Sequence, residues 1–151
     1  MPFPVATIGY QAATVPGFLR ALTDARVELL IDVRAVASSR RAGFAKTALA
    51  ANLETAGIDY LHLRSLGTPA DGRAAARSGR HEEMHRIFRE HLLTHEAQEG
   101  LWRLEGIVKS PRRVALMCFE ADYRECHRTL VADALAERVS IEVTHLVALA
   151  E

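Results

Sequence analysis

The chain has 151 residues and a formal net charge of zero, with 49% hydrophobic and 25% charged residues. These values are typical of a globular protein with a sizeable core, and they predict a single domain over residues 1–151. No apolar run approaches the ~20 residues of a membrane-spanning helix, which excludes a membrane partner, and the neutral charge gives no bulk argument for nucleic-acid binding.

The N-terminus lacks the basic start and apolar stretch of a secretory signal peptide. The chain contains two cysteines, Cys118 and Cys126, which are too few and too close for a disulfide framework. We therefore expect a cytoplasmic protein with reduced thiols.

Strand-like and helix-like patterns alternate along the chain. Short apolar runs predict strands at 5–10, 29–33, 58–63, 113–118 and 141–146. Helical spacing of apolar residues predicts helices at 14–25, 47–56, 81–95, 98–108 and 122–138. Glycine, proline and polar residues indicate loops at 35–44 and 65–79.

This alternation predicts one three-layer α/β domain, in which helices cover both faces of a mainly parallel sheet of about five strands. We consider the strand order 3-2-1-4-5, which would place the first and fourth strands at a topological switch point. One edge of the sheet would then gather the side chains or backbone of Gly9, Tyr10, Asp32, Arg34, Cys118 and Glu120.

Reactive side chains are densest where the fourth predicted strand gives way to a helix. A Cys-Phe-Glu triplet at 118–120 is followed, after five residues, by Cys-His-Arg at 126–128. Two thiols, a carboxylate, an imidazole and a guanidinium therefore lie within eleven residues. Strand-to-helix junctions commonly carry the chemistry of α/β proteins, so we predict the functional site here.

The two thiols have different expected roles. Cys126 falls in the first turn of the predicted helix, where backbone N–H groups and a neighbouring Arg128 would lower its pKa and make it the more reactive thiol. Cys118 ends a buried strand and is expected to pack or to contact a ligand. Packing alone is the alternative role for both.

Glu120 and His127 are the other candidate catalytic groups in this segment. A carboxylate directly after a strand suits a general base, a metal ligand or half of an ion pair. His127 shares its predicted helix face with Leu130, so a hydrogen-bonded core histidine is the alternative. The Cys-x7-Cys-His spacing is not an ordinary zinc pattern, and we predict no metal site, although the cluster would suit a soft metal.

Charged residues also follow the second predicted strand. Asp32 and Arg34 share one strand face, which makes Asp32 a candidate acid or base and a mutual salt bridge the alternative. Arginine predominates in segments 34–46 and 64–80, and its guanidinium group suits carboxylate and phosphate. The expected ligand-binding residues are Tyr10, Arg34, Ser39, Arg40, Cys118 and Arg128.

Residues 81–85 spell His-Glu-x-x-His, and His91 has the spacing of the third ligand in the extended zinc-protease motif. That motif requires glycine where this chain has Phe88. On an unbroken helix His81 and His91 would lie about 15 Å apart along the axis, too far to share an ion. We therefore expect a core helix without catalytic zinc, with a two-histidine site as the alternative.

Several different short motifs are distributed along the chain: Thr7-Ile8-Gly9-Tyr10, Leu30-Ile31-Asp32-Val33-Arg34, Ser39-Arg40, Phe44, Gly57-Ile58-Asp59-Tyr60, Leu66-Gly67 and the Cys-x-Glu-x5-Cys-His-Arg element at 118–128. This set resembles the DUF488 family of uncharacterised bacterial and archaeal proteins over about residues 5–146. The family usually has a proline shortly before the Ser-Arg pair, where this chain has Ala37. The resemblance implies an α/β fold and no assigned activity.

Together, these patterns favour an enzyme that acts on an anionic small molecule, phosphate-bearing or nucleotide-like, through the 118–128 cluster. The alternatives are a non-catalytic ligand- or nucleic-acid-binding module and a metal-binding scaffold. The sequence identifies no cofactor and does not determine the oligomeric state.

Overall fold

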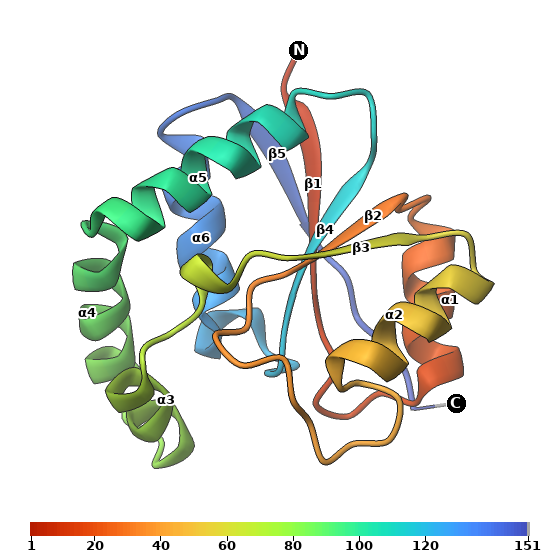
Figure 1. Ribbon diagram of the computed structural model, residues 1–151, viewed down its shortest axis with the longest axis horizontal. Helices are drawn as coiled ribbons and strands as arrows, with labels where there is room; N and C mark the ends of the chain where they lie inside the picture. Colours follow the sequence, from red (N-terminus) through yellow and green to blue (C-terminus); the bar gives the residue numbers. More distant parts are fainter. Residues whose placement is uncertain (151) are drawn as a thin grey trace.

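The computed structural model describes residues 1–150 and contains one five-stranded sheet flanked by helices (Figure 1). The strands are β1 (Phe3–Gly9), β2 (Leu29–Asp32), β3 (Asp59–His62), β4 (Val114–Cys118) and β5 (Ile141–His145). The helices are α1 (Val15–Asp24), α2 (Lys46–Thr55), α3 (Ala70–Arg77), α4 (His81–Leu92), α5 (His95–Val108) and α6 (His127–Ala136). Short 3-10 turns cover Arg64–Leu66 and Tyr123–Glu125.

All neighbouring strands pair in parallel, which confirms the predicted α/β class. The strand order is β3-β2-β4-β1-β5, so the order 3-2-1-4-5 was wrong. β4, rather than β1, lies next to β2, and every residue of β4 is buried. A strand enclosed on both faces and both sides suits the continuous apolar run Val114–Cys118, whereas β5 alternates in exposure as an edge strand does.

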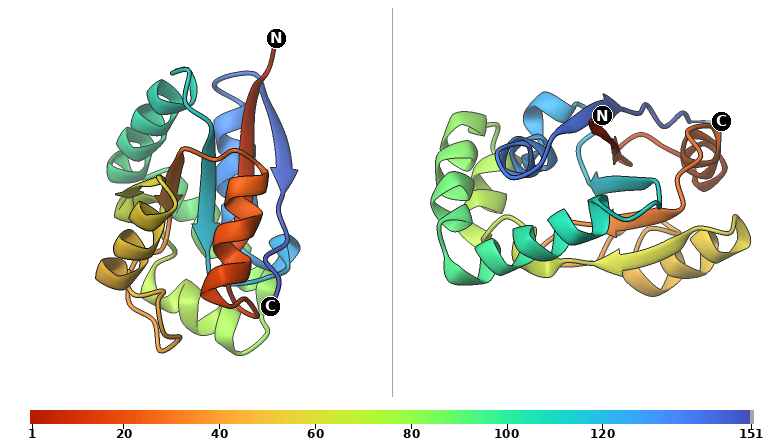
Figure 2. Two further views of the ribbon diagram at one scale, coloured as in Figure 1. Left: turned by 90° about the vertical axis from the view of Figure 1, so that its right-hand side faces the viewer. Right: turned by 90° about the horizontal axis from the view of Figure 1, so that it is seen from above.

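Helices cover both faces of the sheet, as predicted (Figure 2). Each face has its own apolar core. Helices α1 and α2 bury Phe18, Leu22 and Leu53 against one face. Helices α5 and α6 cover the other, with α4 packed against α6 and α3 packed against α4. Within residues 1–150, no helix is both long and apolar enough to cross a bilayer.

The segment 65–79, predicted as a loop, contains the helix α3. Gly72 lies inside this helix and is buried, and a Cβ atom there would collide with the side chain of Thr68. Glycine at this position therefore permits close packing rather than a turn. That use of glycine cannot be told from a loop signal in the sequence.

The last helix also begins later than predicted. Asp122 caps the 3-10 turn, where its carboxylate accepts a hydrogen bond from the Arg124 backbone N–H at 2.9 Å. Cys126 is then extended, with φ −111° and ψ 145°, and forms the N-cap of α6. Cys126 thus precedes the first turn of the helix instead of lying within it.

Candidate functional site

The functional side chains gather where the parallel strands end. Gly9 of β1 pairs with Cys118 of β4, and the backbone N–H groups of Tyr10 and Gln11 donate to the Phe119 carbonyl at 3.1 and 2.8 Å. A Cβ atom on Gly9 would overlap the Glu120 backbone carbonyl. The absence of a side chain at Gly9 thus lets the turn after β4 fold across the end of β1.

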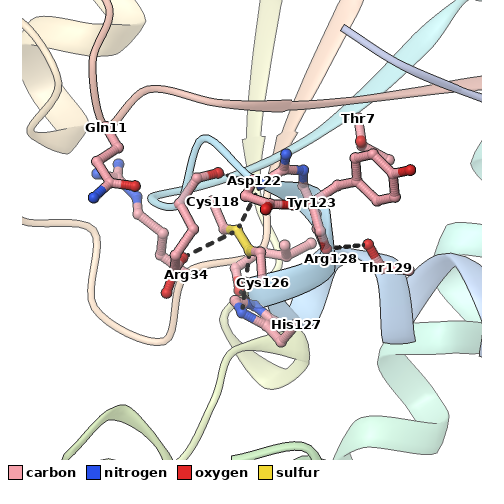
Figure 3. Close-up of a disulfide and its surroundings, with 12 residues drawn as sticks. Thr7, Gln11, Arg34, Cys118, Asp122, Tyr123, Cys126, His127, Arg128 and Thr129 are labelled. Atoms are coloured by element: carbon pink, nitrogen blue, oxygen red, sulfur yellow. Dashed lines mark hydrogen bonds between the residues drawn. A yellow bond between two sulfur atoms is a disulfide. The ribbon is translucent and has the colours of Figure 1, made fainter. Parts of the chain in front are cut away.

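A disulfide joins Cys118 at the end of β4 to Cys126 at the N-cap of α6 (Figure 3). The expectation of reduced thiols was therefore wrong for this structure. Both residues are buried, with 1% and 0% of their surface exposed. Their Cα atoms are 7.1 Å apart, slightly beyond the roughly 4.4–6.8 Å that disulfides usually span.

His127 adjoins this cysteine pair in a fixed orientation. Its Nε2 lies 2.6 Å from the Val33 carbonyl oxygen, which can only accept a hydrogen bond, so Nε2 carries the ring proton. Nδ1 lies 3.9 Å from Cys126 Sγ. Burial lowers the pKa of His127 to about 4, which keeps the imidazole neutral and leaves the Nδ1 lone pair facing the sulfur.

Arg128 is a fully buried cation in the same cluster. Its Nη1 donates to the Glu120 carbonyl at 2.5 Å and lies 3.5 Å from Cys118 Sγ, while Nη2 donates to the Ala121 carbonyl at 3.3 Å. Its Nε has no hydrogen-bond partner among residues 1–150. No carboxylate oxygen in the same range lies within 4.0 Å of this guanidinium group. Burial lowers its pKa to about 10, so Arg128 remains charged at neutral pH.

Glu120 has its carboxylate beside the cysteines rather than on a guanidinium group. Its Oε2 lies 3.7 Å from Cys118 Sγ, and it is Glu120's backbone carbonyl that Arg128 binds. Burial raises the pKa of Glu120, although the charges of Arg128 and His81 oppose that rise. Among residues 1–150, the structural ion pair considered as an alternative for Glu120 is therefore not formed.

Asp32 and Arg34, by contrast, form the mutual salt bridge considered as their alternative. Arg34 Nε and Nη2 donate to the two carboxylate oxygens of Asp32 at 2.9 and 2.7 Å, and Tyr60 donates its hydroxyl to Asp32 at 2.6 Å. Arg34 Nη1 also donates to the Tyr10 hydroxyl and the Phe44 carbonyl. Although burial opposes the charge, Asp32 raises the pKa of Arg34. Asp32 and Arg34 were both predicted as site residues, and both instead bind groups within the protein.

The side chains of the other predicted ligand-binding residues make no hydrogen bond to the thiols within residues 1–150. Tyr10 is buried and stacks on Phe44 with ring centroids 4.7 Å apart. Ser39 accepts a hydrogen bond from the Arg41 backbone N–H at 3.1 Å, and Arg40 is exposed. In the described part of the chain, no hydrogen bond joins Ser39 or Arg40 to the 118–128 cluster.

Helix α4 contributes to the site in a way that sequence reasoning missed. His81 Nε2 lies 3.9 Å from Glu125 Oε1, and its charge acts on Glu120, so His81 lies at the rim of the cluster. His91 instead holds the Ser65 carbonyl at 2.7 Å through Nε2. No periodicity in the sequence indicates that the first turn of α4 meets the turn before α6.

One group of potential metal ligands emerges from this arrangement. One ligand atom from each of Cys118, Cys126 and His127 lies within 4.8 Å of the others. Two surface depressions, one bordered by Arg26 and Arg113 and one by His62 and His95, contain none of these three residues. All three residues are buried, so protein atoms surround the cluster.

Fold and site together define an all-parallel α/β protein with a buried cysteine and histidine cluster at the carboxyl edge of its sheet. Residues 14–135 match DUF488, described as a domain of unknown function, and the chain belongs to this family. No curated protein and no solved structure matches the chain.

Proposed function

We propose that this protein is a thiol-dependent redox enzyme in which Cys118 and Cys126 alternate between a disulfide and a dithiol. The observation that supports this proposal best is the environment of Arg128. A buried guanidinium group without a carboxylate partner is costly, and its Nη1 lies 3.5 Å from Cys118 Sγ. The carboxylates of Glu120 and Asp122 favour the charge of Arg128 only from beyond salt-bridge distance, and a thiolate on Cys118 would be a counter-ion in direct contact.

The reaction requires an external small thiol as the co-reactant. Its thiolate attacks Cys126 Sγ, the disulfide bond breaks, and Cys118 leaves as a thiolate beside Arg128. A second external thiolate attacks the external sulfur of the mixed disulfide and releases Cys126. Two external thiols become one disulfide, and the protein gains two electrons and two protons. Glu120, 3.7 Å from Cys118 Sγ, is placed to transfer the proton of that thiol.

We extend the proposal to an anionic substrate because the segment after β2 carries exposed basic residues, Arg40 and Lys46. A phosphate-bearing or nucleotide-like ligand has weaker support, since Arg34 and Arg128 donate hydrogen bonds within the protein. The burial of both sulfurs favours a small reagent over a protein partner. A small thiol that carries carboxylates fits these constraints.

The proposal reverses the order of thiol reactivity expected from the sequence. Cys118 should ionise more readily than Cys126, because Arg128 lies beside the former. The test compares two single-thiol variants, Cys126→Ser and Cys118→Ser, by timed alkylation with a small neutral reagent. Cys118 should react faster, and Arg128→Gln should slow it about tenfold, since a rise of one pKa unit reduces the thiolate fraction tenfold.

Faster alkylation of Cys126, or no effect of Arg128→Gln in a folded variant, would contradict the assignment.

The substrate class is tested by exchange with two small disulfides of equal length, one a dicarboxylate and the other a diamine. The dicarboxylate should react faster, and its advantage should shrink with added salt. Equal rates would remove the anionic part of the proposal.

A further inference from the structure

Reduction of the cysteine pair would leave a set of donors that suits a soft metal ion. We infer that the reduced protein binds one zinc-like divalent cation through Cys118 Sγ, Cys126 Sγ and His127 Nδ1, with Glu120 as the fourth ligand. This inference rests on the proposed function only in requiring that the cysteines can be reduced. It replaces the sequence-based prediction that the cluster holds no metal.

The distances support Cys118, Cys126 and His127 as one group of ligands. Glu120, by contrast, approaches Cys118 and would have to turn toward the other two. In a tetrahedral zinc site, bond lengths of about 2.3 Å to sulfur and 2.0 Å to nitrogen or oxygen separate two sulfurs by about 3.8 Å and a sulfur from a lighter ligand by about 3.5 Å. Glu120 Oε2 lies 3.7 Å from Cys118 Sγ, and His127 Nδ1 lies 3.9 Å from Cys126 Sγ. These two ligand-to-ligand distances thus already lie within a few tenths of an ångström of the values in a tetrahedral zinc site.

The imidazole is oriented as metal-bound histidines usually are. A metal-bound histidine donates its second ring N–H to a carbonyl or carboxylate, which fixes the tautomer and the ring plane. His127 Nε2 donates to the Val33 carbonyl at 2.6 Å, at the end of the neighbouring strand β2. The free lone pair of Nδ1 therefore faces the sulfurs before any ion binds.

The charges of the cluster would balance around a divalent ion. Two thiolates and the Glu120 carboxylate carry three negative charges, and the cation together with Arg128 carries three positive charges. Arg128 is fully buried, and it binds the carbonyls of Glu120 and Ala121 in the turn between the two cysteines. A neutral cluster avoids the free energy that an unbalanced charge costs in a buried position.

The Cα separation of 7.1 Å also fits a pair of metal ligands. At this spacing the two sulfurs can separate to ligand distance by rotation of their side chains after reduction. The disulfide and the metal complex exclude one another, because both use the same sulfur atoms. Oxidation by an external disulfide would therefore release the cation as two electrons leave the thiolates.

Helix α4 offers the competing location for a metal, because the ring nitrogens His81 Nδ1 and His85 Nε2 have no hydrogen-bond partner among residues 1–150. His91, the third residue of that motif, is held on the Ser65 carbonyl. The three ligand atoms that lie together come from the cysteine cluster instead. Metal binding at the histidines of α4 is therefore one of the outcomes that the following experiment distinguishes.

The test titrates Co²⁺ alone, as a spectroscopic substitute for zinc, into untagged protein that has been reduced and freed of reductant. We expect one equivalent, with thiolate charge-transfer absorption and the visible bands of tetrahedral cobalt. The disulfide form should show neither. Cys126→Ser should abolish the charge-transfer and tetrahedral bands together. His127→Gln should weaken affinity at least about tenfold, and His91→Gln is the matched control with no effect.

X-ray absorption of the zinc-loaded native protein provides a measurement that needs no variant, and two sulfur and two lighter neighbours are expected. A coordination shell without sulfur would overturn the inference, as would binding that survives Cys126→Ser but disappears in the His81→Gln, His85→Gln double variant. A third outcome separates the two proposals. If the thiols alkylate in the predicted order but the reduced protein gives no cobalt spectrum, the metal site is refuted and the redox proposal is not.

Discussion

Two buried arginines in this protein have opposite electrostatic surroundings. Arg34 meets the Asp32 carboxylate through two hydrogen bonds, and its charge is neutralised within the core. Arg128 meets backbone carbonyls and a sulfur atom, and no carboxylate of residues 1–150 pairs with it. Arg34 therefore has a structural role, whereas the charge of Arg128 is available to a group that ionises beside it.

Removal of the charge of Asp32 should destabilise the protein strongly. Asp32→Asn leaves Arg34 buried and unpaired, which should lower the free energy of unfolding by about 3–5 kcal/mol. Asp59→Asn is the matched control, because Asp59 is exposed and its salt bridge with Arg112 is worth less than about 1 kcal/mol. Equal losses in urea-induced unfolding of the two variants would contradict the structural role of Asp32.

Glu120→Gln, unlike Asp32→Asn, should impair the chemistry of the site without destabilising the protein. Burial raises the pKa of Glu120, and the carboxylate has no ion-pair partner among residues 1–150, so a neutral amide should leave the protein at least as stable at neutral pH. Thiol exchange and Co²⁺ affinity should both fall. Thermal unfolding and cobalt titration, with Glu125→Gln as the control, measure the two effects. A loss of several kcal/mol would show that the carboxylate has a structural role.

At the scale of elements, the turn after β4 depends on its close approach to β1. Gly9→Ala would place a methyl group against the Glu120 carbonyl and within 2.9 Å of Arg128 Nη1. Because the obstructing atom is backbone, we expect a loss of more than about 2 kcal/mol in stability and a displaced 118–126 turn. Gly106→Ala is the control, since nothing lies within 4 Å of its added methyl group.

Comparing the two variants by denaturant titration and by the alkylation rate of Cys118 separates stability from site geometry. Gly9→Ala should lower stability and also change the reaction rate, whereas Gly106→Ala should do neither. A stable Gly9→Ala protein with native thiol reactivity would mean that the turn can move away without consequence for the site.

The elements with continuous or periodic apolar patterns were predictable, and those governed by contacts between distant segments were not. The apolar run of β4 and the apolar stripe of α4 indicate their structures locally. The close packing of Gly72 against Thr68 and the late start of α6 after a 3-10 turn depend on partners elsewhere. Likewise, the spacing of the cysteines located the site, but it could not reveal that His127 is anchored on the Val33 carbonyl of another strand.

At the scale of the whole molecule, both cores depend on the same sheet. One core lies between the sheet and α1 and α2, and the other lies between the sheet and α4 to α6. The cluster at the end of β4 is therefore held by strands that are packed on both faces. This rigid support suits a site whose ligand atoms must keep fixed separations. The sequence predicted these strands more accurately than it predicted the set of ligand atoms.

The insertion of β4 between β1 and β2 has a consequence for synthesis of the chain. While the first hundred or so residues leave the ribosome, β1 and β2 have no strand to join them, because their shared neighbour has not yet been made. Both would expose unpaired edges until residues 114–118 emerge, a period in which such edges favour aggregation. Cys118 arrives with this strand and Cys126 eight residues later, so the cysteine pair is completed soon after β4 joins β1 to β2.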